Sequence, residues 1–63
     1  MIEVIIERWT SLAKSTDFRW SVWQDGSRIQ MGGPHRSLEE SEGEALAYCR
    51  TSLGRKPDRV ERL

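Results

Sequence analysis

Residues 18–31, Phe-Arg-Trp-Ser-Val-Trp-Gln-Asp-Gly-Ser-Arg-Ile-Gln-Met, decide the fold because they pair with themselves about one turn. The dipeptide Asp25-Gly26 favours the two-residue turn that closes a tight hairpin. A shift of one residue would exchange the two faces of the paired strands. With this dipeptide at the tip, the sequence predicts five facing pairs: Gln24 with Ser27, Trp23 with Arg28, Val22 with Ile29, Ser21 with Gln30, and Trp20 with Met31.

The predicted pairing separates the side chains of the hairpin into two faces, because alternate residues of a strand point to opposite sides. One face is apolar and is expected to be buried; it holds Phe18, Trp20, Val22, Ile29 and Met31. The other is expected to face solvent; it holds Arg19, Ser21, Trp23, Arg28 and Gln30. The sequence therefore predicts two antiparallel strands over residues 18–24 and 27–32, the second ended by Gly32-Gly33-Pro34.

A further strand is predicted at residues 2–8, where β-branched apolar residues alternate with Glu3 and Glu7. Antiparallel pairing with the first strand of the hairpin would make the apolar faces coincide and match opposite charges across the strands. The predicted register places Val4 opposite Val22, Ile6 opposite Trp20, and Glu7 opposite Arg19. Residues 10–17 are small and polar, and we interpret them as a loop.

A helix is predicted over residues 38–53, because apolar residues recur there at helical spacing. They are Leu38, Ala45, Leu46, Cys49 and Leu53. Ser37 with Glu40 forms a capping-box pattern. Ser41 with Glu44 forms a second one, so the start of the helix stays open by one turn. Gly54 stands where a left-handed C-cap belongs.

The predicted order of elements is β-β-β-α-β, in one small α+β domain that spans residues 1–63. We expect a three- or four-stranded, mainly antiparallel sheet with one helix packed on one face. Whether residues 58–63 form a fourth strand stays open, since Val60 is their only central apolar residue. A strand there would lie parallel to the first strand, because a helical crossover connects it to the sheet.

Size and composition bound the functions that this chain can carry. Its 63 residues include one histidine and one cysteine, which give neither an internal disulfide nor a zinc constellation. The ten basic and ten acidic residues cancel, whereas nucleic-acid-binding domains usually carry a basic excess. The apolar start is too short for a signal peptide or a membrane span, so we expect a cytoplasmic protein that has no membrane contact.

No pattern typical of an enzyme stands out, and we expect no catalytic residue, no cofactor and no metal. Cys49 lies on the apolar stripe of the helix and is interpreted as a small core residue. His35 and Arg36 precede the helix start, where free N–H groups attract anions, so these two residues are candidate anion contacts. The alternative is a turn whose cap is already satisfied, with Glu39 and Glu40 supplying the negative charge.

The solvent-facing side of the sheet is the candidate interaction surface. It is predicted to carry Ile5, Arg19, Trp23, Arg28 and Gln30. Tryptophan and arginine are enriched at the hot spots of protein interfaces, and Trp23 can stack on Arg28, although this pair could also simply cover an exposed sheet. Arginine and glutamine could also read base edges from a sheet that enters a DNA groove. Glu3 and Glu7 on the same face would repel phosphate, which favours a protein partner.

Two residues do not fit this pattern. Trp9 follows the first strand and breaks its alternation, so it either folds back over the open side of the core or lies exposed at an interface. Glu42 falls near the apolar stripe of the helix, and its long side chain is expected to reach out to water.

Four segments in β-β-β-α-β order carry a resemblance to a known family: Ile2–Glu7, Arg19–Val22, Gln30–Gly33 and Ser37–Ala47. They resemble the partial ribonuclease-H-like domain of HicB-type antitoxins. That resemblance implies dimerisation or capture of a toxin, and it implies no catalysis. The Pro-Asp-Leu-Pro-Gly-Cys-like stretch of the family, between its second and third strands, is replaced here by Trp23-Gln24-Asp25-Gly26.

The chain also resembles short bacterial families of unknown function, over about residues 18–50. The residues that match are Trp20-Ser21-Val22, Asp25-Gly26 and Glu44-Ala45-Leu46-Ala47. This second resemblance implies a fold and no activity. We therefore expect a small non-enzymatic binding module of bacterial or phage type that acts by protein–protein interaction or homodimerisation. The alternatives are a nucleic-acid-binding domain that uses the outer sheet face, and antitoxin-type binding of a partner.

Overall fold

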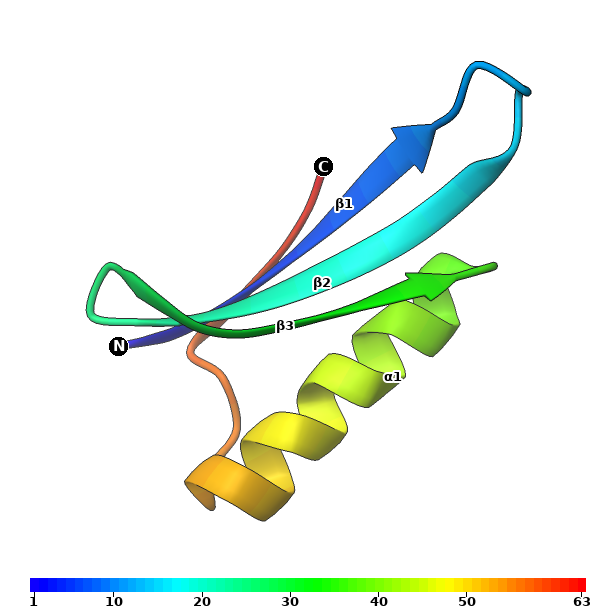
Figure 1. The fold of residues 1–63 in the computed structure, drawn as a ribbon. Coiled ribbons are helices and arrows are strands. Elements are labelled where there is room, and N and C mark those ends of the chain that lie inside the picture. The colour runs from blue at the N-terminus through cyan, green and yellow to red at the C-terminus, as the bar shows by residue number, and fades with distance from the viewer.

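A four-stranded sheet packs one face against a single helix (Figure 1). The elements of the computed structural model, which describes residues 1–63, are β1 (Ile2–Thr10), β2 (Thr16–Gln24), β3 (Ser27–His35), α1 (Leu38–Tyr48) and β4 (Arg59–Arg62). This order confirms the predicted α+β arrangement β-β-β-α-β. The strands lie side by side in the order β3-β2-β1-β4, and all neighbours are antiparallel except β1 and β4.

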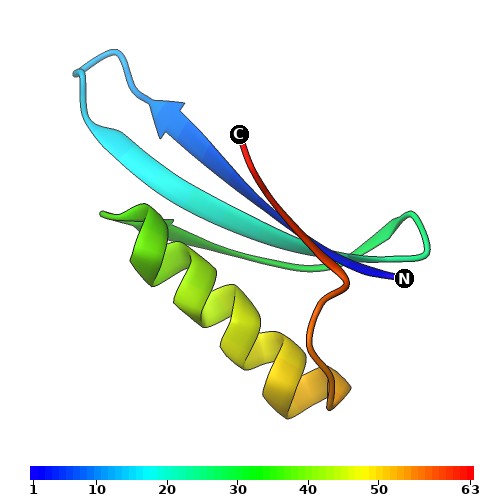
Figure 2. The same cartoon turned by 180° about the vertical axis from the view of Figure 1, so that it is seen from behind.

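The register between β1 and β2 is the predicted one. The confirmed pairs are Val4 with Val22, Ile6 with Trp20, and Glu7 with Arg19. Both strands are longer than predicted, because the β-branched residues Thr10 and Thr16 face each other and extend the ladder. The predicted loop therefore shrinks to residues 11–15. The two strands form a long hairpin that projects past the start of α1 (Figure 1, Figure 2).

The hairpin of β2 and β3 keeps the predicted turn and loses part of the predicted register. Asp25 and Gly26 both have positive φ, 50° and 85°, as a type I′ turn requires. The two pairs next to the turn, Gln24 with Ser27 and Trp23 with Arg28, are confirmed. A β-bulge then shifts β3 by one residue, so the other three predicted pairs are wrong. The observed pairs are Val22 with Gln30, Ser21 with Met31, and Trp20 with Gly32.

The side chain of Trp20 gives a physical reason for the shift. Its indole lies across β3 at Gly32, where an added Cβ would come within 2.6 Å of the ring. The predicted pairing would have put Met31 at this position, where no side chain fits. Ile29 and Met31 were predicted to be buried, and they are instead 37% and 56% exposed. β3 also continues past its predicted end to His35, since an edge strand tolerates proline.

The first capping pattern marks the start of α1. The Oγ of Ser37 accepts a hydrogen bond from the backbone N–H of Glu40 at 3.1 Å. Ser41, the alternative cap, is instead fully buried. Its hydroxyl donates to the carbonyl oxygen of Phe18 at 3.2 Å and so ties the helix to β2.

The helix departs from the prediction in two ways. The α-helix ends at Tyr48, and a turn of wider, π-helical geometry continues it over Cys49–Leu53 to the left-handed cap at Gly54. Glu42 was predicted to reach out to water. It is instead half-buried and accepts two hydrogen bonds from the Arg62 guanidinium, at 2.7 and 2.9 Å. That pair links α1 to β4 and raises the pKa of Arg62.

The chain after the helix does form a fourth strand, which lies parallel to β1 as the crossover predicts. Asp58 fixes its start. One carboxylate oxygen accepts the backbone N–H of Ile2 at 2.7 Å, and the N–H of Asp58 donates to the carbonyl of Ile2 at 2.8 Å. The hydrogen bond from Ile2 holds the pKa of Asp58 below its ordinary value.

The core lies between the sheet and α1. Its buried apolar residues are Ile2, Val4, Ile6, Trp20, Val22, Ala45 and Cys49. Cys49 is a core residue as predicted, and burial raises the pKa of its thiol. Half-buried side chains close the rim, namely Phe18, Leu38, Tyr48, Leu53 and Val60. The one helix is too short and too polar to cross a membrane.

Candidate interaction surface

The sheet face opposite α1 is covered by no other element (Figure 1, Figure 2), and we call it the outer face. Strand alternation and register place on it Glu3, Ile5, Glu7, Trp9, Arg19, Ser21, Trp23, Arg28, Met31, Arg59 and Glu61. The predicted surface residues Ile5, Arg19, Trp23 and Arg28 are therefore brought together. Gln30 is not among them, because the bulge aligns it with the core residue Val22. Met31 takes its place beside Ser21.

At one end of the outer face, Trp23 lies along β2. Its Nε1 donates a hydrogen bond to the Oγ of Ser21 at 2.9 Å, which leaves Ser21 only 6% exposed. The guanidinium carbon of Arg28 lies 5.9 Å from the centre of the Trp23 ring, within the range of a cation–π contact. The indole is thus held by a hydrogen bond along its own strand and by an arginine from β3.

At the other end of the outer face, Trp9 makes a matching arrangement with Arg19. The guanidinium carbon lies 5.3 Å from the ring centre, and Asp17 holds the Nε of Arg19 at 3.3 Å. Trp9 is 51% exposed, so it does not fold back over the core. The expectation that it breaks the alternation of the first strand is wrong, since β1 continues to Thr10 and Trp9 follows Glu7 on the same face.

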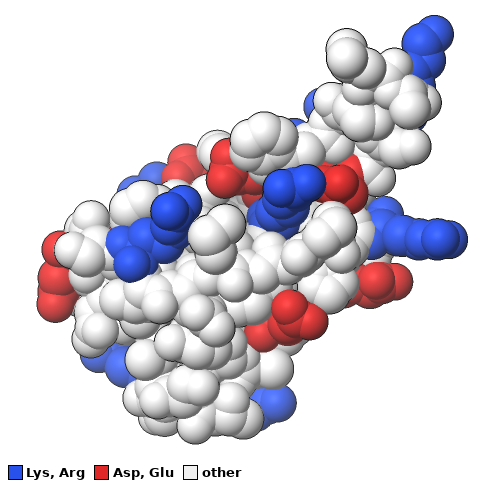
Figure 3. Space-filling model, in the orientation of Figure 1, with Lys and Arg blue, Asp and Glu red and all other residues white.

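Charges of both signs alternate on the outer face. Arg59 lies 3.8 Å from Glu3 and 3.6 Å from Glu61, and Glu7 stands opposite Arg19. The arginines are exposed and the three carboxylates are only partly buried, so each pair adds little to stability. Figure 3 shows blue and red side chains interspersed on the visible side of the molecule, with no broad area of one sign. A mixed surface of this kind suits a protein contact better than a polyphosphate.

His35 and Arg36, the candidate anion contacts, are placed differently from each other. His35 lies at the end of β3, and its buried Nε2 is 3.2 Å from a carboxylate oxygen of Glu44, without the alignment of a hydrogen bond. Its Nδ1 is 3.8 Å from Glu40. His35 thus faces two carboxylates, which leaves no room for an anion, and Arg36 points its charge into solvent without an ion pair.

Glu44 is the centre of this cluster between the sheet and the helix. It accepts a hydrogen bond from Nε1 of Trp20 at 2.9 Å, and it lies against His35. The hydrogen bond from Trp20, together with the contact from His35, holds the pKa of Glu44 below its ordinary value. The cluster locks α1 onto β2 and β3, and no cavity adjoins it.

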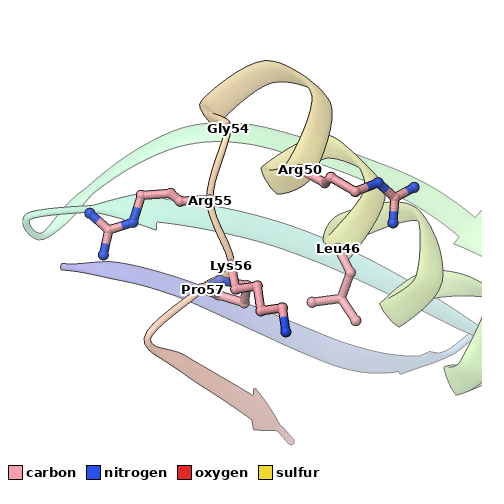
Figure 4. Close-up of a pocket in the computed structure, with 6 residues that line it drawn as sticks. All are labelled: Leu46, Arg50, Gly54, Arg55, Lys56 and Pro57. Carbon is pink, nitrogen blue, oxygen red and sulfur yellow. The ribbon is translucent and has the colours of Figure 1, made fainter.

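A shallow hollow lies between the end of the helix and the chain that leads to β4 (Figure 4). Three of its lining residues are cationic, namely Arg50, Arg55 and Lys56. In Figure 4 the two arginines point away from each other, and Arg55 is engaged by Asp58 at 3.1 Å. The cations therefore do not converge on one point, and the hollow lacks the geometry of an anion site.

Comparison with protein-family models, with characterised proteins and with solved structures finds no match for this chain. The geometry of the outer face is therefore the guide to function. Sequence reasoning left Trp9 open between the core and an interface, and it did not place Met31, Arg59 or Glu61 on this face. The alternation Glu3, Ile5, Glu7, Trp9 could have decided the position of Trp9, whereas the bulge that exposes Met31 left no signal in β3 itself.

Proposed function

We propose that this domain is a non-enzymatic protein-interaction module that forms a homodimer through its outer face. The observation that carries the proposal is the pair of tryptophan–arginine stacks, Trp9 with Arg19 and Trp23 with Arg28, at the two ends of a face that no helix covers. Tryptophan and arginine contribute most strongly to binding at protein interfaces. Ile5 and Met31 supply apolar area between the two stacks.

Charge favours a second copy of the chain as the partner. A face of mixed sign meets its own copy without net repulsion, and the chain as a whole carries no net charge.

The edges of the sheet are poorer surfaces for self-association. β3 carries two register irregularities and Pro34, which has no N–H to donate, and both features blunt an edge. β4 has four residues, which is short for a strand that would pair with another chain. These features favour contact through the outer face over extension of the sheet.

The test is sedimentation equilibrium of the purified chain over a range of protein concentrations. We expect a dimer whose dissociation constant rises at least tenfold, or about 1.4 kcal/mol, in Met31→Lys, because the lysine places a charge in the apolar area of the outer face. Gln30→Lys is the matched control, since it adds the same charge one residue away on the other side of β3. Circular dichroism verifies that both variants fold.

Two results would contradict the proposal. A wild-type chain that stays monomeric at all concentrations would show that no homodimer forms. A dimer that both variants weaken equally would show that the outer face is not its interface. Persistence of the dimer at high salt is also expected, because apolar and stacked contacts are screened far less than exposed ion pairs.

A further inference from the structure

The far end of the β1–β2 hairpin is a second surface with its own chemistry, and we call residues 8–18 the arm. The arm projects beyond α1 (Figure 1, Figure 2), and every residue from Arg8 to Thr16 is exposed. Figure 3 shows that the outermost part of this projection carries blue and white side chains. The arm therefore contributes no buried side chain to the core except at its base, where Phe18 lies half-buried.

Two backbone hydrogen bonds close the turn at the tip of the arm. The N–H of Ser11 donates to the carbonyl of Ser15, and the N–H of Lys14 donates to the carbonyl of Ser11, both at 2.9 Å. Its residues nevertheless break the usual rules of turn chemistry. Leu12 is fully exposed, and Lys14 has a φ of 63°, in the left-handed region where glycine or asparagine is usual. Residues that break the local rules of turn chemistry without stabilising the folded state are typical of functional positions.

The arm carries more cations than anions. Arg8 and Lys14 make no ion pair and are both exposed. Asp17 is the one acidic residue of the arm, and the Nε of Arg19 lies 3.3 Å from its carboxylate. Residues 8–18 thus carry a net charge of +1 in a chain whose net charge is zero.

We propose that the arm binds duplex DNA by entering a groove. A two-stranded β-ribbon fits the major groove, which is about 12 Å wide. Lysine, arginine and hydroxyl groups contact phosphate oxygens, and four hydroxyl residues line the arm, namely Thr10, Ser11, Ser15 and Thr16. An aliphatic side chain at a tip can wedge against base steps, which gives exposed Leu12 a role. The proposal goes beyond self-association, and Trp9 is the one residue of the two stacks that belongs to the arm.

The partner is duplex DNA, because A-form RNA has a major groove that is too deep and narrow for a ribbon. Binding is expected to be independent of base sequence, since Arg8 and Lys14 would contact the backbone. Two phosphate contacts predict a slope of about −2 in log affinity against log salt, or roughly a tenfold loss of affinity between 50 and 200 mM salt.

The experiment is a fluorescence-anisotropy titration of a labelled mixed-sequence DNA duplex with the full chain at a series of salt concentrations. We expect Arg8→Gln and Lys14→Gln each to reduce the salt slope by about 1. Leu12→Ser is expected to weaken binding several-fold with no change of slope. Lys56→Gln, at the other end of the molecule, is the matched control and is expected to change neither affinity nor slope. All four positions are exposed, so the variants should keep the fold, which circular dichroism verifies.

Three results would overturn the proposal. The first is no binding of duplex at low salt. The second is binding that Lys56→Gln reduces as much as Lys14→Gln, because the cationic surface would then lie elsewhere. The third is a preference for single-stranded DNA, or for vesicles of anionic phosphatidylglycerol, over the duplex. Sedimentation of Lys14→Gln keeps this result separate from the homodimer, since the arm variant should associate like the wild type.

Discussion

The two hairpins of this domain share the strand β2, yet only one of them has the register that the sequence predicts. In the β1–β2 hairpin, Val4 and Ile6 face Val22 and Trp20, and all four side chains are buried. In the β2–β3 hairpin, the pairing follows the turn for two residues and then shifts. The difference shows that a register is readable when both strands bury side chains on the same face. The register cannot be read from the sequence when one strand packs beneath a large ring of its neighbour, as β3 does beneath Trp20.

The largest expected effect comes from removing that ring. Trp20→Ala should lower the free energy of unfolding by about 3–5 kcal/mol, which is typical of aromatic truncation in a core. A chain of this size has roughly 3–5 kcal/mol in total, so the variant should be unfolded. Trp23→Ala, on the outer face of the same strand, is the control and should stay folded. Urea denaturation followed by circular dichroism measures both, and a folded Trp20→Ala would show that β2 is not the centre of the core.

The second effect concerns the glycine that lies beneath the ring. Gly32→Ala should lower the free energy of unfolding by about 1–3 kcal/mol, because the new Cβ would lie 2.6 Å from the Trp20 indole. Gly43→Ala is the matched control, since its Cβ meets no atom within 4 Å and alanine favours a helix by up to about 1 kcal/mol. Urea denaturation should therefore give shifts of opposite sign. If both variants changed the free energy of unfolding in the same direction, the steric explanation for the bulge would be wrong.

A third effect depends on pH and tests the contacts by which Glu44 holds α1 against β2 and β3. The pKa of Glu44 is lowered by its hydrogen bond from Trp20 and by His35, so folding favours the ionised carboxylate. The stabilisation is complete above the ordinary carboxyl pKa of 4.5 and is lost as the pH falls through the lower folded value. Glu44→Gln should flatten this part of the stability profile. Identical profiles for Glu44→Gln and the wild type would exclude Glu44 as the source.

The smallest effects compare the two stacks, one from each hairpin. Arg19→Gln and Arg28→Gln should each lower the free energy of unfolding by about 0.5–1 kcal/mol, as expected for cation–π contacts at exposed sites. The two values should be similar despite the different registers, because both stacks lie on the outer face. A loss above 2 kcal/mol for either variant in urea denaturation would show that the arginine does more than stack.

Much of the candidate surface could be predicted from the sequence, and the exceptions have identifiable causes. Ile5, Arg19, Trp23 and Arg28 follow from alternation alone. Gln30 was placed on the wrong face, because a bulge inserts one residue and reverses the alternation beyond it. A pattern of period 2 carries no sign of such an insertion when the strand lies at an edge and few of its side chains are buried.

By itself the sequence determined the order of elements as far as the helix, the turn at Asp25-Gly26 and the pairing of β1 with β2, and it limited the helix cap to Ser37 or Ser41. These features rest on contacts between near neighbours or on a strict alternation of buried side chains, which residue types express directly. Only the tertiary structure decided that Gly32 lies under Trp20, that Ser41 anchors the helix to Phe18, and that β4 joins the sheet. These outcomes depend on the volume left between elements that are distant in sequence, and volume is fixed only when the elements pack.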